Sequence, residues 1–153
     1  MNDKRRKIVI RGVAWMTHAS SILRKQLFVN WTECSGKKLP VQTLIDDEEL
    51  RALLSDVLSD IETAKEYIEK AYEEEDECAQ SLENSTGLGW TGKGTDIDSN
   101  AIKLCSALTT LEKIHSSLSE ALAQNFEDIN YQNIQKIEDA LFDAIFDAVV
   151  TAQ

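Results

Sequence analysis

The chain has 153 residues, an apolar fraction of 42% and a formal net charge of −11. This length is typical of a single domain with its own core, and this apolar fraction argues against disorder throughout the chain. Cys34, Cys78 and Cys105 are widely separated and lack CxxC spacing, which argues against a disulfide framework. With no stretch long and apolar enough to span a membrane, we expect a cytoplasmic protein.

The net charge is unevenly distributed along the chain. Residues 1–38 hold nine Lys or Arg against two acids, a net +7, whereas residues 39–153 hold seven against twenty-five, a net −18. The acids are densest between Asp46 and Glu83. A field of this sign repels nucleic acid directly and favours basic partners.

The first predicted helix runs from about residue 4 to 31. Apolar residues recur there at helical spacing in two adjacent rows: Ile8, Gly12, Trp15, Ala19 and Ile22 in one, and Val9, Val13, Met16, Leu23 and Leu27 in the other. The next segment, residues 33–44, contains Gly36 and Pro40, which are natural helix breakers.

The second predicted helix, about residues 46–82, carries an unbroken heptad stripe. Its members alternate in spacing between four and three residues, and all but one are small or apolar: Leu50, Leu54, Val57, Ile61, Ala64, Ile68, Ala71, Glu75, Cys78 and Leu82. Only an α-helix places such positions on one side, so this stripe is expected to be buried against other helices.

A Gly-rich connector is expected over residues 84–98. Its glycines match two phosphate-binding patterns, but a helix precedes them instead of a strand and Gly94 stands where a P-loop requires Ser or Thr, so no nucleotide cofactor is expected. Trp90 either packs back onto the bundle or, with Lys93 beside it, contacts a partner.

Two further helices are predicted, at about residues 99–125 and 131–151. The stripe of the first is Ala101, Leu104, Leu108, Leu111, His115, Leu118 and Leu122, in which we interpret His115 as a structural core histidine. The second carries apolar residues on a wide face that includes Phe142 and Phe146, which indicates burial on more than one side.

The charges of the first two helices complement each other when the helices are antiparallel. Counting away from the turn at equal rise brings Arg5 level with about Tyr72. Glu75, the one charge in the stripe, is therefore expected to pair with Arg5 or Arg6, and a polar residue at such a position helps to set register. Such pairing neutralises part of the acidic segment, and the remainder is left for a basic partner.

No metal site is expected from the sequence. Residues 96–100 begin like a calcium loop, but Ala101 and Ala107 replace its essential glycine and glutamate. His18, His115 and the cysteines are scattered, and no paired constellation for nucleophilic or acid–base catalysis emerges.

Arg11 and His18 are separated by six residues, a spacing found in the arginine–histidine motif of the HEPN ribonuclease family. The chain resembles that all-α family in these two residues and in helix content. The resemblance implies a metal-independent ribonuclease with this pair at a dimer interface. Gly12 follows the arginine where the family usually has a polar residue, and the motif lies in the first helix instead of near the end of the domain.

The sequence therefore predicts one all-α domain, residues 1–153, that folds as an antiparallel bundle of four long helices. We interpret it as a non-enzymatic inhibitor, of the phage anti-defence, immunity or antitoxin type, that covers the nucleic-acid-binding surface of a basic protein or nucleic-acid-processing complex. The candidate contact residues are Trp90, Lys93, Glu62, Glu66, Glu69, Glu73, Glu74, Asp76 and Glu77. The alternatives are a structural or adaptor helical homodimer and the HEPN-like ribonuclease.

Overall fold

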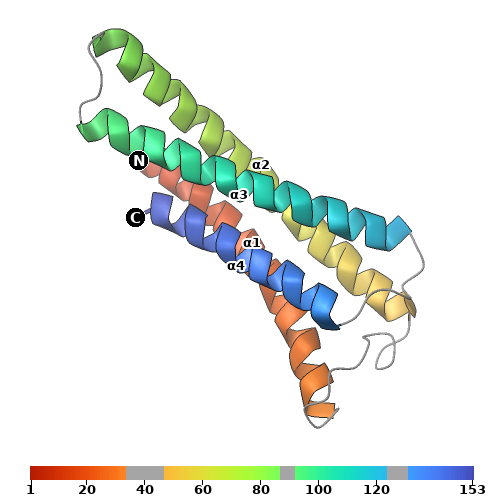
Figure 1. Cartoon of the computed structure of the whole chain (residues 1–153). Coiled ribbons are helices and arrows are strands. Elements are labelled where there is room, and N and C mark those ends of the chain that lie inside the picture. Colours follow the sequence, from red (N-terminus) through yellow and green to blue (C-terminus); the bar gives the residue numbers. More distant parts are fainter. Residues whose placement is uncertain (34–46, 87–91, 124–130) are drawn as a thin grey trace.

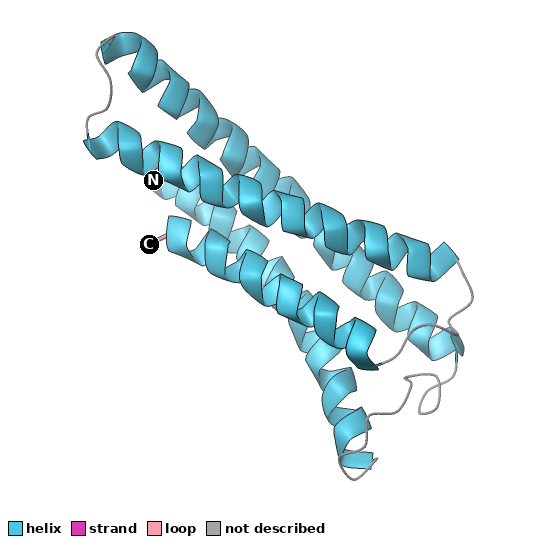
Figure 2. Cartoon of the chain, in the orientation of Figure 1, coloured by secondary structure: helices cyan, strands magenta, loops and turns pink. Residues whose placement is uncertain are grey.

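The structure is a computed structural model that describes residues 1–33, 47–86, 92–123 and 131–153, with side chains described within 1–25, 48–78, 99–123 and 133–153. These residues form four helices: α1 (Asp3–Glu33), α2 (Asp47–Thr86), α3 (Gly92–Ala123) and α4 (Tyr131–Thr151). No strand occurs among them, as Figure 2 shows. The predicted all-α bundle of four helices is confirmed.

The helices are arranged as an elongated antiparallel bundle (Figure 1). Each helix packs mainly against two others, in the order α1–α2–α3–α4 and back to α1. Both termini lie at the same end of the bundle (Figure 1). This closed ring gives each helix one flank toward each neighbour and an outward surface, so positions on a helix can be assigned to a face of the bundle.

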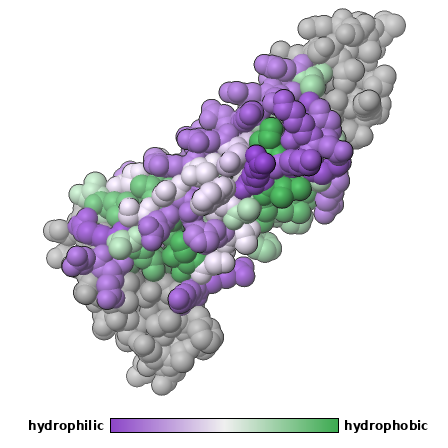
Figure 3. Space-filling model, turned by 180° about the vertical axis from the view of Figure 1, so that it is seen from behind, coloured by the Kyte–Doolittle hydropathy of each residue, from purple (hydrophilic) through white to green (hydrophobic). Residues whose placement is uncertain are grey.

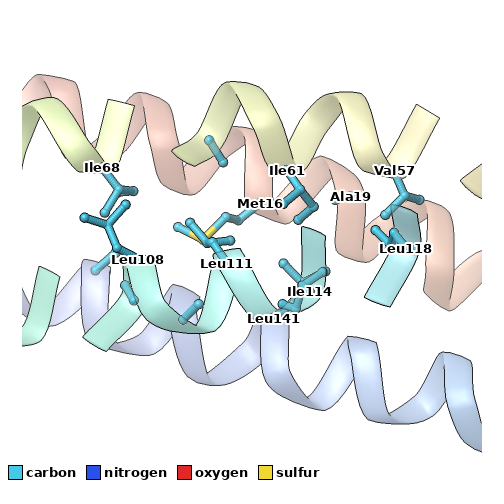
Figure 4. Close-up of a cluster of buried hydrophobic side chains, with 14 of the residues drawn as sticks. Met16, Ala19, Val57, Ile61, Ile68, Leu108, Leu111, Ile114, Leu118 and Leu141 are labelled. Atoms are coloured by element: carbon cyan, nitrogen blue, oxygen red, sulfur yellow. The ribbon is translucent and has the colours of Figure 1, made fainter. Parts of the chain in front are cut away.

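The core is built from the heptad stripe of α2 and matching stripes of the other helices. Eight stripe members are buried, from Leu50 through Glu75, and Cys78 is half-buried. Leu82, the last member, lies outside the described side chains. Met16 of α1 is fully buried and lies near Ile61 and Leu111 (Figure 4). The stripe thus acts as predicted, as the seam of an intramolecular bundle.

The start of α1 is capped despite its basic residues. The Asn2 side-chain oxygen accepts a hydrogen bond from the Arg5 backbone N–H at 2.9 Å, which satisfies one of the free donors of the first turn. Asp3 adds a negative charge at this positive end and pairs with Arg6 at 2.7 Å. These two residues offset the unfavourable charge of Lys4, Arg5 and Arg6 at the helix start.

Helices α1 and α2 approach closely at Gly12. A Cβ atom at this position would lie 2.7 Å from Ile68 Cδ1 and 3.3 Å from Tyr67 Cβ. Gly12 therefore provides the space into which Ile68 packs, which explains a glycine inside a long helix, where it costs about 0.5–1 kcal/mol relative to alanine.

The expected connector over residues 84–98 is shorter in the structure. Helix α2 continues to Thr86, and α3 begins at Gly92 instead of residue 99. Helix propagation gains one backbone hydrogen bond for each residue it fixes, and this gain outweighs the cost of two glycines in the first turn of α3.

Trp15 and His115, which were assigned to apolar stripes, are not in the core. Phe142 and Phe146 of α4 are exposed as well, so the expected burial of α4 on more than one side is wrong for these two residues. Trp15 is exposed, because α1 buries Met16 and Gly12 instead. His115 is half-buried, and its neighbour Ile114 occupies the core position. In each of the pairs Trp15/Met16 and Ile114/His115, the periodicity allowed either residue to face the core. The relative rotation of the packed helices decided which one does.

Candidate functional site

A row of glutamates covers the outward surface of α2. Between residues 62 and 77 six positions are exposed, and five of them are glutamates: Glu62, Glu66, Glu69, Glu73 and Glu77. The sixth is Lys70. The spacing of four, three, four and four residues places all five carboxylates along one side of the helix. We call these five residues the glutamate row.

The glutamate row is a dense linear array of negative charge. Side chains three or four apart on a helix are neighbours at about 5–6 Å, and fifteen residues of helix span roughly 22 Å. The Oε1 atom of Glu62 lies 3.0 Å from the Nε2 atom of His115. Among the described side chains, Glu66, Glu69, Glu73 and Glu77 make no ion pair. Most of the row is therefore not neutralised by any side chain that the structure describes.

Glu74 and Asp76, the other two candidate acids, lie on either flank of α2 and are half-buried. The negative charge of Asp76 is the largest of the influences that raise the pKa of Tyr72 above its ordinary value of 10.0, followed by the charge of Cys105, burial and a hydrogen bond with Cys105. Asp76 therefore lies near Tyr72 on α2, and its partial burial makes it less open to a partner than the row itself.

Glu75 turns inward and pairs with α1. Its side chain is fully buried, and Arg5 donates a hydrogen bond from Nε to Glu75 Oε1 at 2.7 Å. Burial lowers the pKa of Arg5, but the hydrogen bond and charge of Glu75 raise it more, so the Arg5 pKa lies above its ordinary value. The structure therefore contains the pair that the level count predicted, with Arg5 as the partner.

The rest of the basic start of α1 does not neutralise α2. Arg6 pairs with Asp3 on its own helix, and Lys4 and Lys7 are exposed without an ion pair among the described side chains. From the side of α1 and α2, hydrophilic side chains concentrate toward the end where α1 begins (Figure 3). At this end of the bundle, Arg5–Glu75 is thus the one ion pair between α1 and α2 among the described side chains.

His18 makes a contact that the sequence interpretation missed. Its Nδ1 atom lies 2.5 Å from Oδ2 of Asp60, a buried aspartate on α2, while the imidazole stays mostly exposed and meets Trp15 edge-on. This contact could have been predicted from the sequence. The count of levels along antiparallel helices that placed Arg5 near the end of α2 also brings His18 level with Ser59, the residue before Asp60. Asp60 needs such a partner, since a buried carboxylate is costly without one.

Arg11, the other residue of the arginine–histidine spacing, is exposed on α1 and makes no ion pair among the described side chains. It lies two helical turns from His18, roughly 10 Å along the axis. Within one chain the structure does not bring these two side chains together at a common reacting group.

Trp90 and Lys93 cannot be assigned to the candidate site. Trp90 lies outside the described residues, and Lys93 falls in the first turn of α3, where side chains are not described. Their predicted role in partner contact stays a prediction.

Within the described ranges, no group of three or more His, Cys, Asp or Glu side chains is arranged to hold a metal ion. In the same part of the chain, no helix combines the length and apolarity that crossing a bilayer requires.

Comparison with known proteins yielded no protein-family model, curated protein or solved structure that matches this chain.

Proposed function

We propose that this protein is a non-enzymatic interaction module that covers a basic, nucleic-acid-binding surface of a partner protein. The observation that carries this proposal is the glutamate row, a line of exposed carboxylates of which only Glu62 has a partner among the described side chains. A chain needs no such row for folding, because like charges three or four residues apart destabilise a helix by about 0.2–0.5 kcal/mol per pair.

The dimensions of the row support a nucleic-acid-like role. Its five charges over roughly 22 Å give one charge per about 5 Å, compared with one phosphate per 3.4 Å along each strand of DNA. A groove lined by Lys and Arg that binds a phosphate backbone can therefore meet several carboxylates of the row at once. Such a contact would compete directly with nucleic acid for the same surface.

Affinity capture from a lysate of the organism in which this protein occurs, followed by mass spectrometry, tests this function. We expect a basic, nucleic-acid-binding partner that is released at high salt, because the Debye length falls to about 3 Å at 1 M salt. Adding the purified chain should also displace nucleic acid from that partner. A complex that survives molar salt unchanged, or one that leaves nucleic-acid binding intact, contradicts the proposal.

Charge-matched variants locate the surface. Glu69→Gln with Glu73→Gln should weaken capture at least tenfold, because it removes two adjacent charges from the row. Asp56→Asn with Glu120→Gln changes the net charge equally at two exposed positions outside the row and should leave capture within about twofold. Equal losses in both variants would show that net charge, and not the row, controls binding.

A further inference from the structure

The described side chains include five large apolar residues that are exposed, and three of them belong to one face of the bundle. Phe142 and Phe146 of α4 are 59% and 62% exposed, and Ile10 of α1 is 52% exposed. Trp15 and Ile102 are the other two. Single exposed apolar residues are ordinary, but a grouped set marks an interaction surface.

The ion pair between Arg24 and Glu138 joins α1 to α4 and identifies the flank of α4 that faces α1. Phe142 and Val149 follow Glu138 by four and eleven residues, so they lie on this same flank. Phe146 follows Phe142 by four residues and points slightly further outward. On the opposite flank, Asp147 accepts a hydrogen bond from Ser106 of α3, which confirms the rotation of α4.

The same reasoning places the residues of α1. Thr17, Val13 and Ile10 precede Arg24 by seven, eleven and fourteen residues, so they lie on the flank that faces α4. Val13 is half-buried at the seam between the helices, and Ile10 and Thr17 are exposed. Together these residues form a largely apolar surface, the α1/α4 face, defined by Ile10, Val13, Thr17, Phe142, Phe146 and Val149.

The charges on the seam between α1 and α4 are paired among the described side chains. Arg24 bonds to Glu138 across the seam, and Arg6 bonds to Asp3. The face therefore offers no unpaired charge at its centre to a nucleic acid or a strongly charged protein. Its chemistry fits another surface that is apolar in the middle.

We propose that the occupant of the α1/α4 face is a second copy of this chain, related by a two-fold axis parallel to the bundle. Such an axis keeps the level along the bundle and exchanges helices, so α4 of one copy packs on α1 of its partner. Each copy then presents the same surface to the other, which closes the assembly at two chains.

The shapes of the two helices complement each other in this arrangement. Counting from the Arg24–Glu138 pair along antiparallel helices, Phe142 is level with Ser20 and Phe146 is level with Met16. The outward residues of α1 around these levels are small: Ala14, Thr17 and Ser21, all exposed. Each phenylalanine of one copy thus meets small side chains of the other, which leave space for its ring.

The charges at the margins are complementary as well. Lys25 is exposed at the outer edge of α1, and Asp139 is exposed at the outer edge of α4, two residues from the same level. Within one copy they lie at opposite edges of the face. The two-fold axis brings Lys25 of each copy beside Asp139 of the other, so these opposite charges attract. An arrangement that paired like helices would instead bring like charges together.

Sedimentation analysis of the purified chain at micromolar concentration tests the proposal. We expect a mass twice the 17.2 kDa of one chain. Phe142→Ser with Phe146→Ser should give a monomer with unchanged helical circular dichroism, because both side chains are exposed. Ile102→Ser, at a 63% exposed position on the outward side of α3, is the matched control and should stay dimeric. A monomeric wild-type chain, or a dimer that survives the double substitution, overturns the proposal.

A charge exchange tests the two-fold arrangement itself. Lys25→Glu should raise the dimer dissociation constant several-fold, and adding Asp139→Lys should restore it, because the pair forms again in reversed sense. Failure of the second substitution to restore dimerisation overturns the arrangement. These outcomes are independent of the proposed function, since the glutamate row lies on α2, outside the α1/α4 face.

Discussion

The buried pair of Arg5 and Glu75 is incompletely hydrogen bonded. Among the described residues, Oε2 of Glu75 and Nε of the neighbouring Arg6 are buried without a hydrogen-bond partner. Because one oxygen of the buried carboxylate lacks a hydrogen bond, the pair offsets less of the desolvation of its charges than a fully bonded pair would. We therefore expect its main effect to be on the register of α1 against α2.

A double-mutant cycle on this pair gives a clear expectation. Arg5→Met should destabilise the fold by about 3–5 kcal/mol, because it leaves the Glu75 carboxylate buried without a counter-charge. Arg5→Met combined with Glu75→Leu should restore stability to within about 1 kcal/mol of the wild type. Urea denaturation followed by circular dichroism measures both. A double variant as unstable as Arg5→Met alone would show that the pair is a net stabiliser.

Gly12 offers a second test at the residue scale. Gly12→Ala gains about 0.5–1 kcal/mol of helix propensity but overpacks the contact with Ile68, which costs about 1–3 kcal/mol, so we expect net destabilisation. Ile68→Val removes Cδ1, the atom nearest the new methyl group. The double variant should therefore be more stable than the sum of the single effects predicts, and strict additivity would contradict the close approach.

At the scale of the element, α2 has two sides of opposite character. Its stripe, from Leu50 to Glu75, is buried in the core, and its glutamate row is exposed. The first side is selected by packing, whereas the second is unfavourable for an isolated helix because its neighbouring charges repel. A helix whose surface opposes its own stability is the kind of element in which function and stability compete.

This competition predicts an unusual result for the row variant. Glu69→Gln with Glu73→Gln should raise the free energy of unfolding by a few tenths of a kcal/mol, because it removes repulsion between adjacent carboxylates. The same variant is expected to lose partner capture. The stabilisation should fade at high salt, where screening has already removed the repulsion. A variant that is clearly less stable than the wild type would mean that the row contributes to folding.

At the scale of the whole molecule, the charged and apolar surfaces are separated. The glutamate row lies on the outward side of α2, and the α1/α4 face lies along a different pair of helices. The proposed partner and the proposed second copy therefore do not compete for the same residues. A dimer would then carry two rows, which increases avidity for a partner with repeated basic sites.

Periodicity in the sequence was sufficient to predict four helices and most of the α2 core, because one helix face must be apolar to be buried. It also sufficed to place the basic start of α1 beside Glu75, since equal rise in antiparallel helices converts residue numbers into levels, but only the structure chose Arg5 over Arg6 as the partner. Only the tertiary structure decided the rotation of each helix, which exposes Trp15, Phe142 and Phe146 and buries Ile114 in place of His115. The rotation of a helix depends on how all four helices pack together. Where the apolar face of a helix is wider than the surface it can bury, the sequence does not determine which of its residues face the core.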